Sequence, residues 1–457
     1  MRNGSCTEAE KSATLARLWG WMGGGNNSNN NEEEDYDGDD REPARLPRYF
    51  LACEAASIIL REPPSSSLAA ERCPFYEADA LRGILEAAAR ACGSPLPSLD
   101  AGKALKLAFN IVAGSQTTAR KVFEDNHACT KLAGMFKTAA KTQQPQLETI
   151  ALVNMLCAFI ERLAATVPTT AVYAVFVSNI DFVNELLTML EVALAWQERG
   201  DHRDLTLGVR LINVLYALSL RAAKQRQAKN EAKSDRTRDS ASLLFAGKDG
   251  GASLERMCLV LVRILHLPDR ADNSLTLRTA ATTVLYNVLD AGGDDGVPIE
   301  NICTTDRATS PRLHIVRIVR ALIRLAEQWI VHYVVEGSPK TKMDSTLLPC
   351  VLVLLHLCSK EAELEKSKTL TEETEDAPGH LTVTLQVMLR MSADDFLKRS
   401  IIRLINPISS TPRVATVVSE LVWICCGKDG QSVVQFVGAG AAAQILIQQG
   451  VLQLPGT

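Results

Sequence analysis

Aromatic side chains are scarce in this sequence, and long uncharged runs are missing. Phe, Trp and Tyr make up 5% of the 457 residues, whereas hydrophobic residues together reach 46%. The core must therefore be built mainly from Ala, Leu, Val and Ile, which favours helices packed through small residues over sheets. Because no uninterrupted run of 18 apolar residues occurs, we expect no integral membrane segment.

Paired cysteine motifs are also missing. The twelve cysteines are scattered, none forms a C-x-x-C pair, and most lie inside apolar runs. This pattern is typical of buried thiols in a reducing compartment, and it argues against a disulfide or zinc framework. The adjacent Cys425 and Cys426 could be redox-active, or one of them could face the core. Since the N-terminus has no apolar signal-peptide core either, we expect a cytoplasmic protein without a metal site.

The short motifs of common enzymes do not occur. No phosphate-binding loop, H-E-x-x-H, G-x-S-x-G or kinase motif set is present. Gly438-x-Gly440-x-x-Ala443 looks like a dinucleotide-binding turn, but the sequence ends at Thr457, before the second strand and acidic residue such a turn needs. A net charge of −4 gives no overall attraction to nucleic acid. We therefore expect no covalent catalysis, no cofactor and no nucleic-acid partner.

The N-terminal part of the chain differs in composition from the rest. Gly23–Asp40 is an acidic, low-complexity stretch that offers too little apolar surface to offset the entropy of ordering. We assign residues 1–45 to a disordered N-terminal segment, with a short amphipathic helix around Leu15 and Leu18 near its start. Residues 46–457 form the predicted folded domain.

From residue 46 onward, apolar residues recur with the period of a helix. The predicted helices include 102–115, 118–139, 146–165 and 204–233. Polar and glycine-rich stretches between helices are expected to be inserted loops. In one of them Thr369 precedes Glu372 by three residues, a context that a kinase could use, although a plain solvated loop is the favoured interpretation.

Several helices share one pattern, in which large apolar residues are followed by a small or amide residue. The shared column holds Asn110, Ala158, Ala217, Asn287 and Cys425, and its first three steps are 48, 59 and 70 residues long. Armadillo and HEAT repeats span about 40–47 residues, so loops must lengthen these units. The sequence thus predicts an all-α fold, an armadillo/HEAT-like α-solenoid of irregular helical repeats with inserted loops, and we expect a monomer.

Such a stack offers a concave trough in which polar residues can bind an extended or helical peptide. Asn110 and Asn287 interrupt apolar helices at equivalent positions, and a buried amide must find partners. Each either ties down a neighbouring segment or binds a ligand backbone. Arg61 and Lys106 could make the trough locally basic, although either one alone could be an ordinary surface charge.

The end of the chain carries a more specific pattern. LVWICCGKDGQSVVQFVGAGAAAQILIQQGVL (421–452) resembles the end of the armadillo-like core of the synembryn family. ALKLAFNIVAGSQTTAR (104–120) is similar to a repeat of that family, and ASIILRE (56–62) is similar to the helix of its first repeat. The likeness extends thinly over about residues 50–452.

The resemblance implies a guanine-nucleotide exchange factor and chaperone for heterotrimeric G-protein α subunits. Such a protein holds an α subunit nucleotide-free, with the C-terminal helix of the α subunit docked in the trough. Arg61 and Asn110 match positions that contact this helix, Tyr216 would supply an aromatic wall, and Lys106 and Asn287 complete the predicted binding set. The partner would be a GDP-bound or nucleotide-free α subunit, which could recruit the protein to the cell cortex. A general armadillo-type peptide-binding scaffold or transport adaptor is the alternative.

Overall fold

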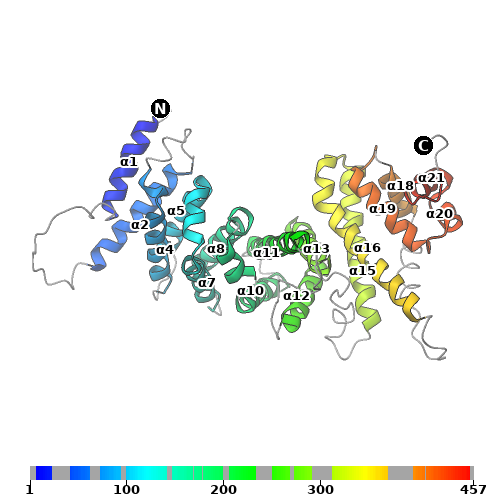
Figure 1. The fold of residues 1–457 in the computed structure, drawn as a ribbon, viewed down its shortest axis with the longest axis horizontal. Coiled ribbons are helices and arrows are strands. Elements are labelled where there is room, and N and C mark those ends of the chain that lie inside the picture. Colours follow the sequence, from blue (N-terminus) through cyan, green and yellow to red (C-terminus); the bar gives the residue numbers. More distant parts are fainter. Residues whose placement is uncertain are drawn as a thin grey trace, which may run out of the picture. The chain divides into compact units, whose positions relative to one another are not determined.

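The structure is a computed structural model. The residues that it describes are 7–22, 42–61, 73–93, 99–141, 147–167, 169–177, 179–198, 205–232, 250–267, 272–290, 311–368, 395–406 and 408–452. These residues form eighteen α-helices and a few 3-10 and π-helical turns, and they contain no strand (Figure 1). The predicted all-α, solenoid-like fold of stacked helices is therefore confirmed.

The chain divides into two compact units, residues 1–236 with 243–250 and residues 237–242 with 251–457. The first unit is made of α1 (Glu8–Trp21), α2 (Glu42–Ile59), η1 (Pro74–Tyr76), α4 (Ala78–Cys92), α5 (Leu99–Gly114), α6 (Gln116–Phe123), α7 (Asn126–Ala140), α8 (Leu147–Thr166), α9 (Thr170–Val172), η2 (Tyr173–Val177), α10 (Ile180–Glu198) and α11 (Leu205–Ala232).

Two rows of helices make up the first unit. In one row α2 packs on α5, α5 on α8, and α8 on α11; we call these four helices the α5 row. In the other row α4 packs on α7 and α7 on α10, and we call these three the α7 row. Each α7-row helix also contacts a neighbour in the α5 row, so the core lies between the rows (Figure 1). This is the repeat stacking that the apolar faces of the sequence require.

The N-terminal helix α1 is part of this unit. Its Leu15 and Leu18 are each 5% exposed, and the Trp19 ring meets the Phe75 ring edge-on with centroids 5.3 Å apart. The short helix expected here is therefore present and packs on α2 and η1. It lies inside residues 1–45, the segment we predicted to be disordered; the acidic run of that segment lies outside the described residues.

The helix predicted over residues 118–139 is divided into α6 and α7. Asp125 adopts an extended conformation between them, and its carboxylate accepts a hydrogen bond of 2.9 Å from the backbone N–H of His127. Ser115 caps α6 in the same way, accepting from the N–H of Thr118 at 3.2 Å. Side-chain caps of this kind satisfy N–H groups that have no partner inside their helix.

The second unit has helices of its own. It comprises α12 (Gly250–Leu265), α13 (Asp272–Asp290), α15 (Pro311–Ile330), η6 (Val331–Val335), η7 (Lys340–Lys342), α16 (Met343–Lys368), α18 (Asp395–Ile405), α19 (Pro412–Cys425), α20 (Gly430–Val437) and α21 (Ala439–Gln448). Here α16 packs between α13 and α19, while α15 contacts α16 and α18 contacts α19.

The glycine-rich end of the chain folds as a helix–turn–helix. Gly438 separates α20 from α21 and has a φ of 82°, a conformation that glycine adopts without strain. The segment before it is helical, so this turn does not follow a strand as a dinucleotide-binding turn does. The helical interpretation of this segment is confirmed.

Two segments are long and apolar enough to cross a membrane when judged by length and composition alone. They are Thr149–Thr166 in α8 and Lys340–Ser359, which includes most of α16, and 56% of each is buried within the structure. Each helix packs between two neighbours of its own unit, as the core helix of a repeat stack does. The absence of an integral membrane segment stays a prediction.

Candidate protein-docking surface

Four of the five predicted binding residues lie on the α5 row. Arg61 follows the end of α2, Lys106 and Asn110 lie on α5, and Tyr216 lies on α11. Arg61 and Lys106 are exposed, Asn110 is half-buried, and Tyr216 is 36% exposed. Asn287 is a half-buried residue of α13 in the second unit. Thr369, the candidate phosphosite, lies outside the described residues.

Asn110 ties α5 to the last turn of α2. Its side-chain Nδ2 donates a hydrogen bond of 2.7 Å to the backbone carbonyl of Ser57. In an ideal helix that carbonyl would accept from the N–H of Arg61, but this N–H donates to the carbonyl of Ile58 instead, at 3.4 Å. The amide of Asn110 thus satisfies a carbonyl left open at the end of α2. Of the two roles open to this residue, the structure supports the tie to a neighbouring segment.

A cation on α5 is already paired within the row. Lys103 lies 3.6 Å from the carboxylate of Glu54 on α2 and 3.5 Å from that of Asp100 on its own helix. Arg61 and Lys106, by contrast, form no ion pair with any residue that the structure describes. Both side chains are exposed, so a carboxylate from another molecule can reach them.

The outward stripe of α2 combines apolar and charged residues. Leu51, Glu54, Ile58 and Arg61 follow the i, i+3, i+7, i+10 spacing of one helix face, and all four are exposed. Leu51 is 58% and Ile58 is 65% exposed, although both are large and apolar. An apolar stripe flanked by charges is the kind of surface on which an amphipathic helix docks.

At the other end of the row, α8 and α11 are joined by a charged pair. Arg210 lies 3.8 Å from Glu161, and both side chains are partly exposed. Burial raises the pKa of the Glu161 carboxyl, and the Arg210 guanidinium partly offsets that rise. Because Arg210 and Glu161 pair with each other, the exposed ring of Tyr216 is the side chain that a docked helix would contact at this end of the α5 row.

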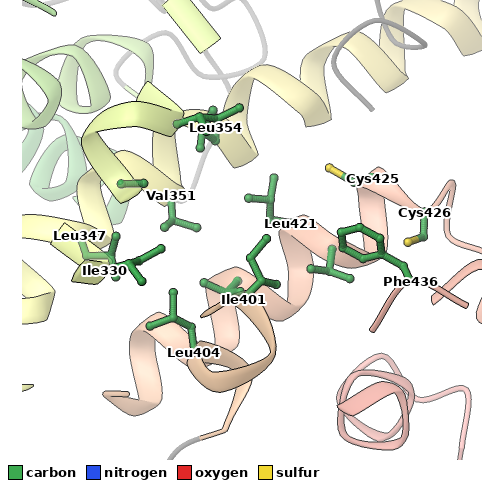
Figure 2. A pocket seen from close by; sticks show the side chains of 14 residues that line it. Ile330, Leu347, Val351, Leu354, Ile401, Leu404, Leu421, Cys425, Cys426 and Phe436 are labelled. Atoms are coloured by element: carbon green, nitrogen blue, oxygen red, sulfur yellow. The ribbon is translucent and has the colours of Figure 1, made fainter. Parts of the chain in front are cut away.

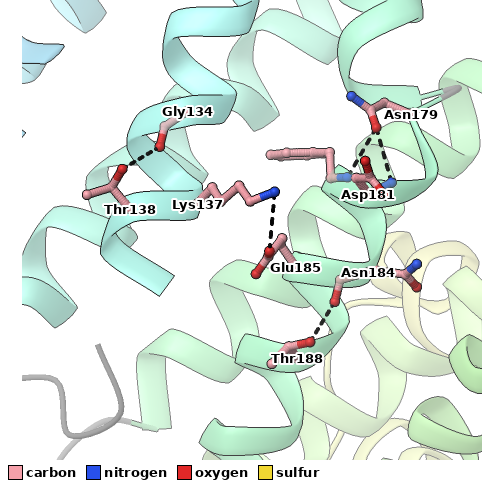
Figure 3. A network of polar contacts seen from close by, with 9 residues as sticks. Gly134, Lys137, Thr138, Asn179, Asp181, Asn184, Glu185 and Thr188 are labelled. Atoms are coloured by element: carbon pink, nitrogen blue, oxygen red, sulfur yellow. Dashed lines mark hydrogen bonds and ion pairs between the residues drawn. The ribbon is translucent and has the colours of Figure 1, made fainter. Parts of the chain in front are cut away.

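The α7 row carries lysines of a different kind. Lys137 on α7 lies 3.9 Å from Glu185 on α10 (Figure 3). Lys131 approaches Glu86 on α4 to 2.7 Å, and this contact lowers the pKa of the Glu86 carboxyl. Both lysines have an acidic partner within the protein. Arg90 on α4 is exposed and, like Arg61 and Lys106, forms no ion pair with a described residue, so the choice of the α5 row rests on its exposed apolar stripe.

One arrangement at the end of η6 has the geometry of a catalytic triad. His332 Nδ1 lies 2.6 Å from a Glu336 carboxylate oxygen, and His332 Nε2 lies 2.9 Å from the hydroxyl of Ser338. The N–H of Ser338, however, donates to the carbonyl of His332, and the next residue, Pro339, has no N–H. Neither residue can therefore contribute a donor to an oxyanion hole. The three side chains close a turn at the end of η6.

The second unit contains an apolar pocket that the sequence analysis did not predict. It lies between α15, α16, α18, α19 and α20, and its empty space amounts to about 650 Å³ with the open solvent at its mouth included (Figure 2). Its walls are aliphatic and aromatic side chains together with the thiols of Cys425 and Cys426. The lining has no charged group and therefore cannot hold a nucleotide or a peptide carboxylate. The residues are Ile323, Ala326, Ile330, Leu347, Val351, Leu354, Ile401, Leu404, Val418, Leu421, Val422, Cys425, Cys426 and Phe436.

The cysteines in the described part of the chain are all buried. Burial raises the pKa of Cys129 to about 12, and it also raises the pKa of Cys157, where the nearby Glu161 adds to the effect. These thiols are therefore protonated and unreactive at neutral pH. This fits the buried, reduced thiols that the sequence analysis expected. Cys425 and Cys426 are likewise buried, and they lie on the pocket wall.

We expect Cys129 and Cys157 of the folded protein to resist iodoacetamide at pH 8. The same residues should react fully in guanidinium chloride, and mass spectrometry of the digested protein measures both. Because the folded-state pKa of each thiol is raised, the stability gained from keeping it neutral is present below about pH 8.5 and declines above it. Rapid labelling of either residue in the native protein would contradict its burial.

The fold and this surface define a helical-repeat protein that offers an exposed docking row. A comparison with known families identifies the family of the chain. The family model described as "Guanine nucleotide exchange factor synembryn" matches residues 87–456. The chain therefore belongs to the synembryn family of guanine nucleotide exchange factors. The resemblance found in the sequence is confirmed, and no curated protein matches the chain.

Proposed function

We propose that this exchange factor acts on the α subunit of heterotrimeric G proteins by docking its C-terminal helix on the α5 row. The observation that carries the proposal is the exposed stripe of α2 beside two cations without an acidic partner among the described residues. A helix with an apolar face and carboxylates would bury Leu51 and Ile58 and pair with Arg61 and Lys106.

Docking alone can release the nucleotide, without a catalytic side chain. If the row binds the C-terminal helix better when that helix is detached from its own domain, binding shifts the population toward an open form that loses GDP. When GTP enters, the α subunit closes, and the detached helix that the row binds better is no longer present. The same preference stabilises a partly folded α subunit, which amounts to chaperoning by mass action.

The remaining features of the proposal follow from this mechanism. The protein performs no covalent catalysis, works as a cytoplasmic monomer, and reaches the cell cortex through its partner. The partner enters GDP-bound and is held nucleotide-free. Tyr216 forms an aromatic wall of the docking surface on α11. Asn287, on α13 of the second unit, stays a predicted contact.

We expect the protein to speed GDP release from a purified α subunit, measured as loss of a fluorescent GDP analogue. The acceleration should disappear when the last turns of the C-terminal helix are deleted from the α subunit, because the docked segment is then absent. A general scaffold would bind the α subunit and leave the release rate unchanged. Acceleration of the truncated α subunit at the full rate would place the docking contact elsewhere.

A further inference from the structure

We propose that the turn between α18 and α19 docks on a membrane surface that carries anionic lipids. Ile408 in this turn enters the headgroup region of the bilayer, while nearby lysines and arginines pair with the lipid phosphates. The inference goes beyond the proposed function, because it concerns a contact of the second unit that needs no α subunit.

The turn presents an apolar side chain to solvent. Ile408 is 79% exposed, the largest exposed fraction of any large apolar residue that the structure describes. Ser410 holds the turn from below, since it is 4% exposed and its hydroxyl donates a hydrogen bond of 2.6 Å to the carbonyl of Leu404. Single apolar residues are common on protein surfaces, so the exposure alone identifies no partner. It shows that Ile408 is already displayed in the free protein.

The backbone of Ile408 is prepared to leave water. Its N–H donates a hydrogen bond of 2.9 Å to the side-chain Oδ1 of Asn406, and its carbonyl accepts a hydrogen bond from the ammonium group of Lys340. A backbone group without a partner is costly to transfer out of water. Because both groups of Ile408 have partners within the protein, the residue can enter a bilayer interface without that cost.

Four exposed cations lie close to this side chain. Lys340 contacts the Ile408 carbonyl, and Lys342 follows two residues later. Arg403 lies in the last turn of α18, and Arg413 lies in the first turn of α19, on either side of the turn. All four side chains are exposed. A lysine or arginine close to an anionic bilayer strengthens binding by about 5-fold, so this group can hold the turn at the membrane surface.

Two acidic residues lie in the chain between η6 and the first turn of α16, and each is engaged within the protein. The Glu336 carboxylate lies 2.6 Å from Nδ1 of His332. Asp344 accepts a hydrogen bond from the hydroxyl of Thr411. The four cations outnumber these two carboxylates, so the surface around Ile408 is positive. Charge complementarity therefore points to an anionic partner.

The mixture of apolar and charged groups favours a membrane over a protein as that partner. The core of a protein interface gathers several apolar residues and is depleted in charge. Here one apolar side chain stands among cations, and its neighbours Asn406 and Ser409 are polar. A bilayer interface takes up an isolated apolar side chain while its anionic headgroups attract the surrounding cations, and the two contributions add.

The test uses the full chain and two kinds of vesicle, one of phosphatidylcholine alone and one of equal amounts of phosphatidylcholine and phosphatidylserine. Co-sedimentation should show binding to the mixed vesicles, weaker binding at high salt, and little binding to phosphatidylcholine. Ile408→Ser should weaken binding to the mixed vesicles by about 5- to 20-fold, whereas Ile408→Leu should bind as the wild type does. Because Ile408 is exposed, circular dichroism should be the same for all three proteins.

The contribution of charge is tested separately. Lys342→Gln together with Arg413→Gln leaves the Lys340 bond to the turn in place and should weaken vesicle binding by about 25-fold. Lys131→Gln together with Lys137→Gln is the matched control, since it removes the same charge from the α7 row. We expect the control to bind vesicles within about 2-fold of the wild type.

Three results would overturn the proposal. The first is a wild-type protein that does not bind the mixed vesicles. The second is binding that neither Ile408→Ser nor the Lys342 and Arg413 pair weakens, which would place the lipid contact elsewhere. The third is a loss of GDP release from the α subunit without vesicles in Ile408→Ser, combined with unchanged vesicle binding, which would assign the turn to a protein partner. Vesicle binding does not depend on the α5 row, so failure of the proposed function would leave these measurements unaffected.

Discussion

A chain carrying Arg61→Glu and Lys106→Glu is expected to lose nearly all of its exchange activity. The substitutions replace two cations that have no acidic partner among the described residues with carboxylates, so attraction for an acidic helix becomes repulsion. Charged anchors of an interface commonly contribute about 2 kcal/mol or more, so the pair should reduce affinity by roughly 30- to 1000-fold. The rate of GDP release at a fixed, sub-saturating concentration measures the loss.

Lys131→Glu together with Lys137→Glu is the matched control. It changes the net charge by the same amount, but on the α7 row, where both lysines already pair with carboxylates (Figure 3). We expect near-normal exchange and a small loss of stability, about 0.2–1 kcal/mol for each pair. If the control lost activity as severely as the test variant, overall charge would explain the result and the assignment to the α5 row would fail.

The spacing of Arg61 and Lys106 also limits the partner. Arg61 lies four residues after Ser57, and Lys106 lies four residues before Asn110, the residue bonded to Ser57. Each offset is about 6 Å along the helix axes, which the Lys103–Glu54 contact shows to run parallel, and the spacing between two packed helices adds about 8–10 Å across the row. Two carboxylates of a partner must therefore lie roughly 15 Å apart to reach both cations.

The sequence predicted those parts of the fold that depend on local pattern. The apolar period of α5, α8 and α11 is regular, and these helices pack next to one another as their shared column required. The break at Asp125 was missed because the apolar period continues across it in the sequence. The sequence did carry a signal for this break, because aspartate favours the N-cap position of a helix. Asp125 takes that position and accepts a hydrogen bond from the backbone N–H of His127.

The shared column leaves out one helix of the stack. The shared column passes from Asn287 on α13 to Cys425 on α19, although α16 packs between these two helices. Pro349 lies inside α16 and removes a backbone donor, so the sequence there departs from the pattern of the other units. Tertiary packing on both sides keeps the helix continuous, which sequence pattern alone does not reveal.

Sequence reasoning offered a tie to a neighbouring segment as one role of Asn110, but it could not name the partner. Its partner, the carbonyl of Ser57, is 53 residues away in the chain, and a backbone carbonyl carries no sequence signal. The apolar pocket of the second unit likewise gathers residues of five helices, none unusual by itself. The residue types of the site could be predicted, whereas its contacts needed the fold.

Gly114→Ala is expected to destabilise the first unit strongly. A Cβ at this position would lie 2.4 Å from the hydroxyl oxygen of Tyr76 and 3.0 Å from the ring carbon that carries it. The ring cannot move away easily, because Tyr76 is 9% exposed and its carbonyl accepts a hydrogen bond from the hydroxyl of Thr118. Such overpacking costs about 1–3 kcal/mol, and urea unfolding followed by circular dichroism measures it.

Gly102→Ala is the control within the same helix. Among the described residues, no atom outside its own helical backbone and chain neighbours lies within 4 Å of a Cβ built there. Only the helix propensity therefore changes, and this variant should be more stable by about 0.5–1 kcal/mol. Opposite signs for one substitution at two positions of α5 would separate the clash from any general effect of losing glycine. Equal effects would mean that α5 and Tyr76 are not in close contact.

Tyr76→Phe completes the cycle. The Tyr76 hydroxyl is buried and has no hydrogen-bond partner among the described residues, and burial raises its pKa to about 12. Removing a buried hydroxyl that forms no bond should leave the protein equally stable or about 1 kcal/mol more stable. In this background Gly114→Ala should cost less, because the closest atom to the new methyl group is gone. If both backgrounds gave the same cost, the strain would arise from the backbone of Gly114 and not from its contact with Tyr76.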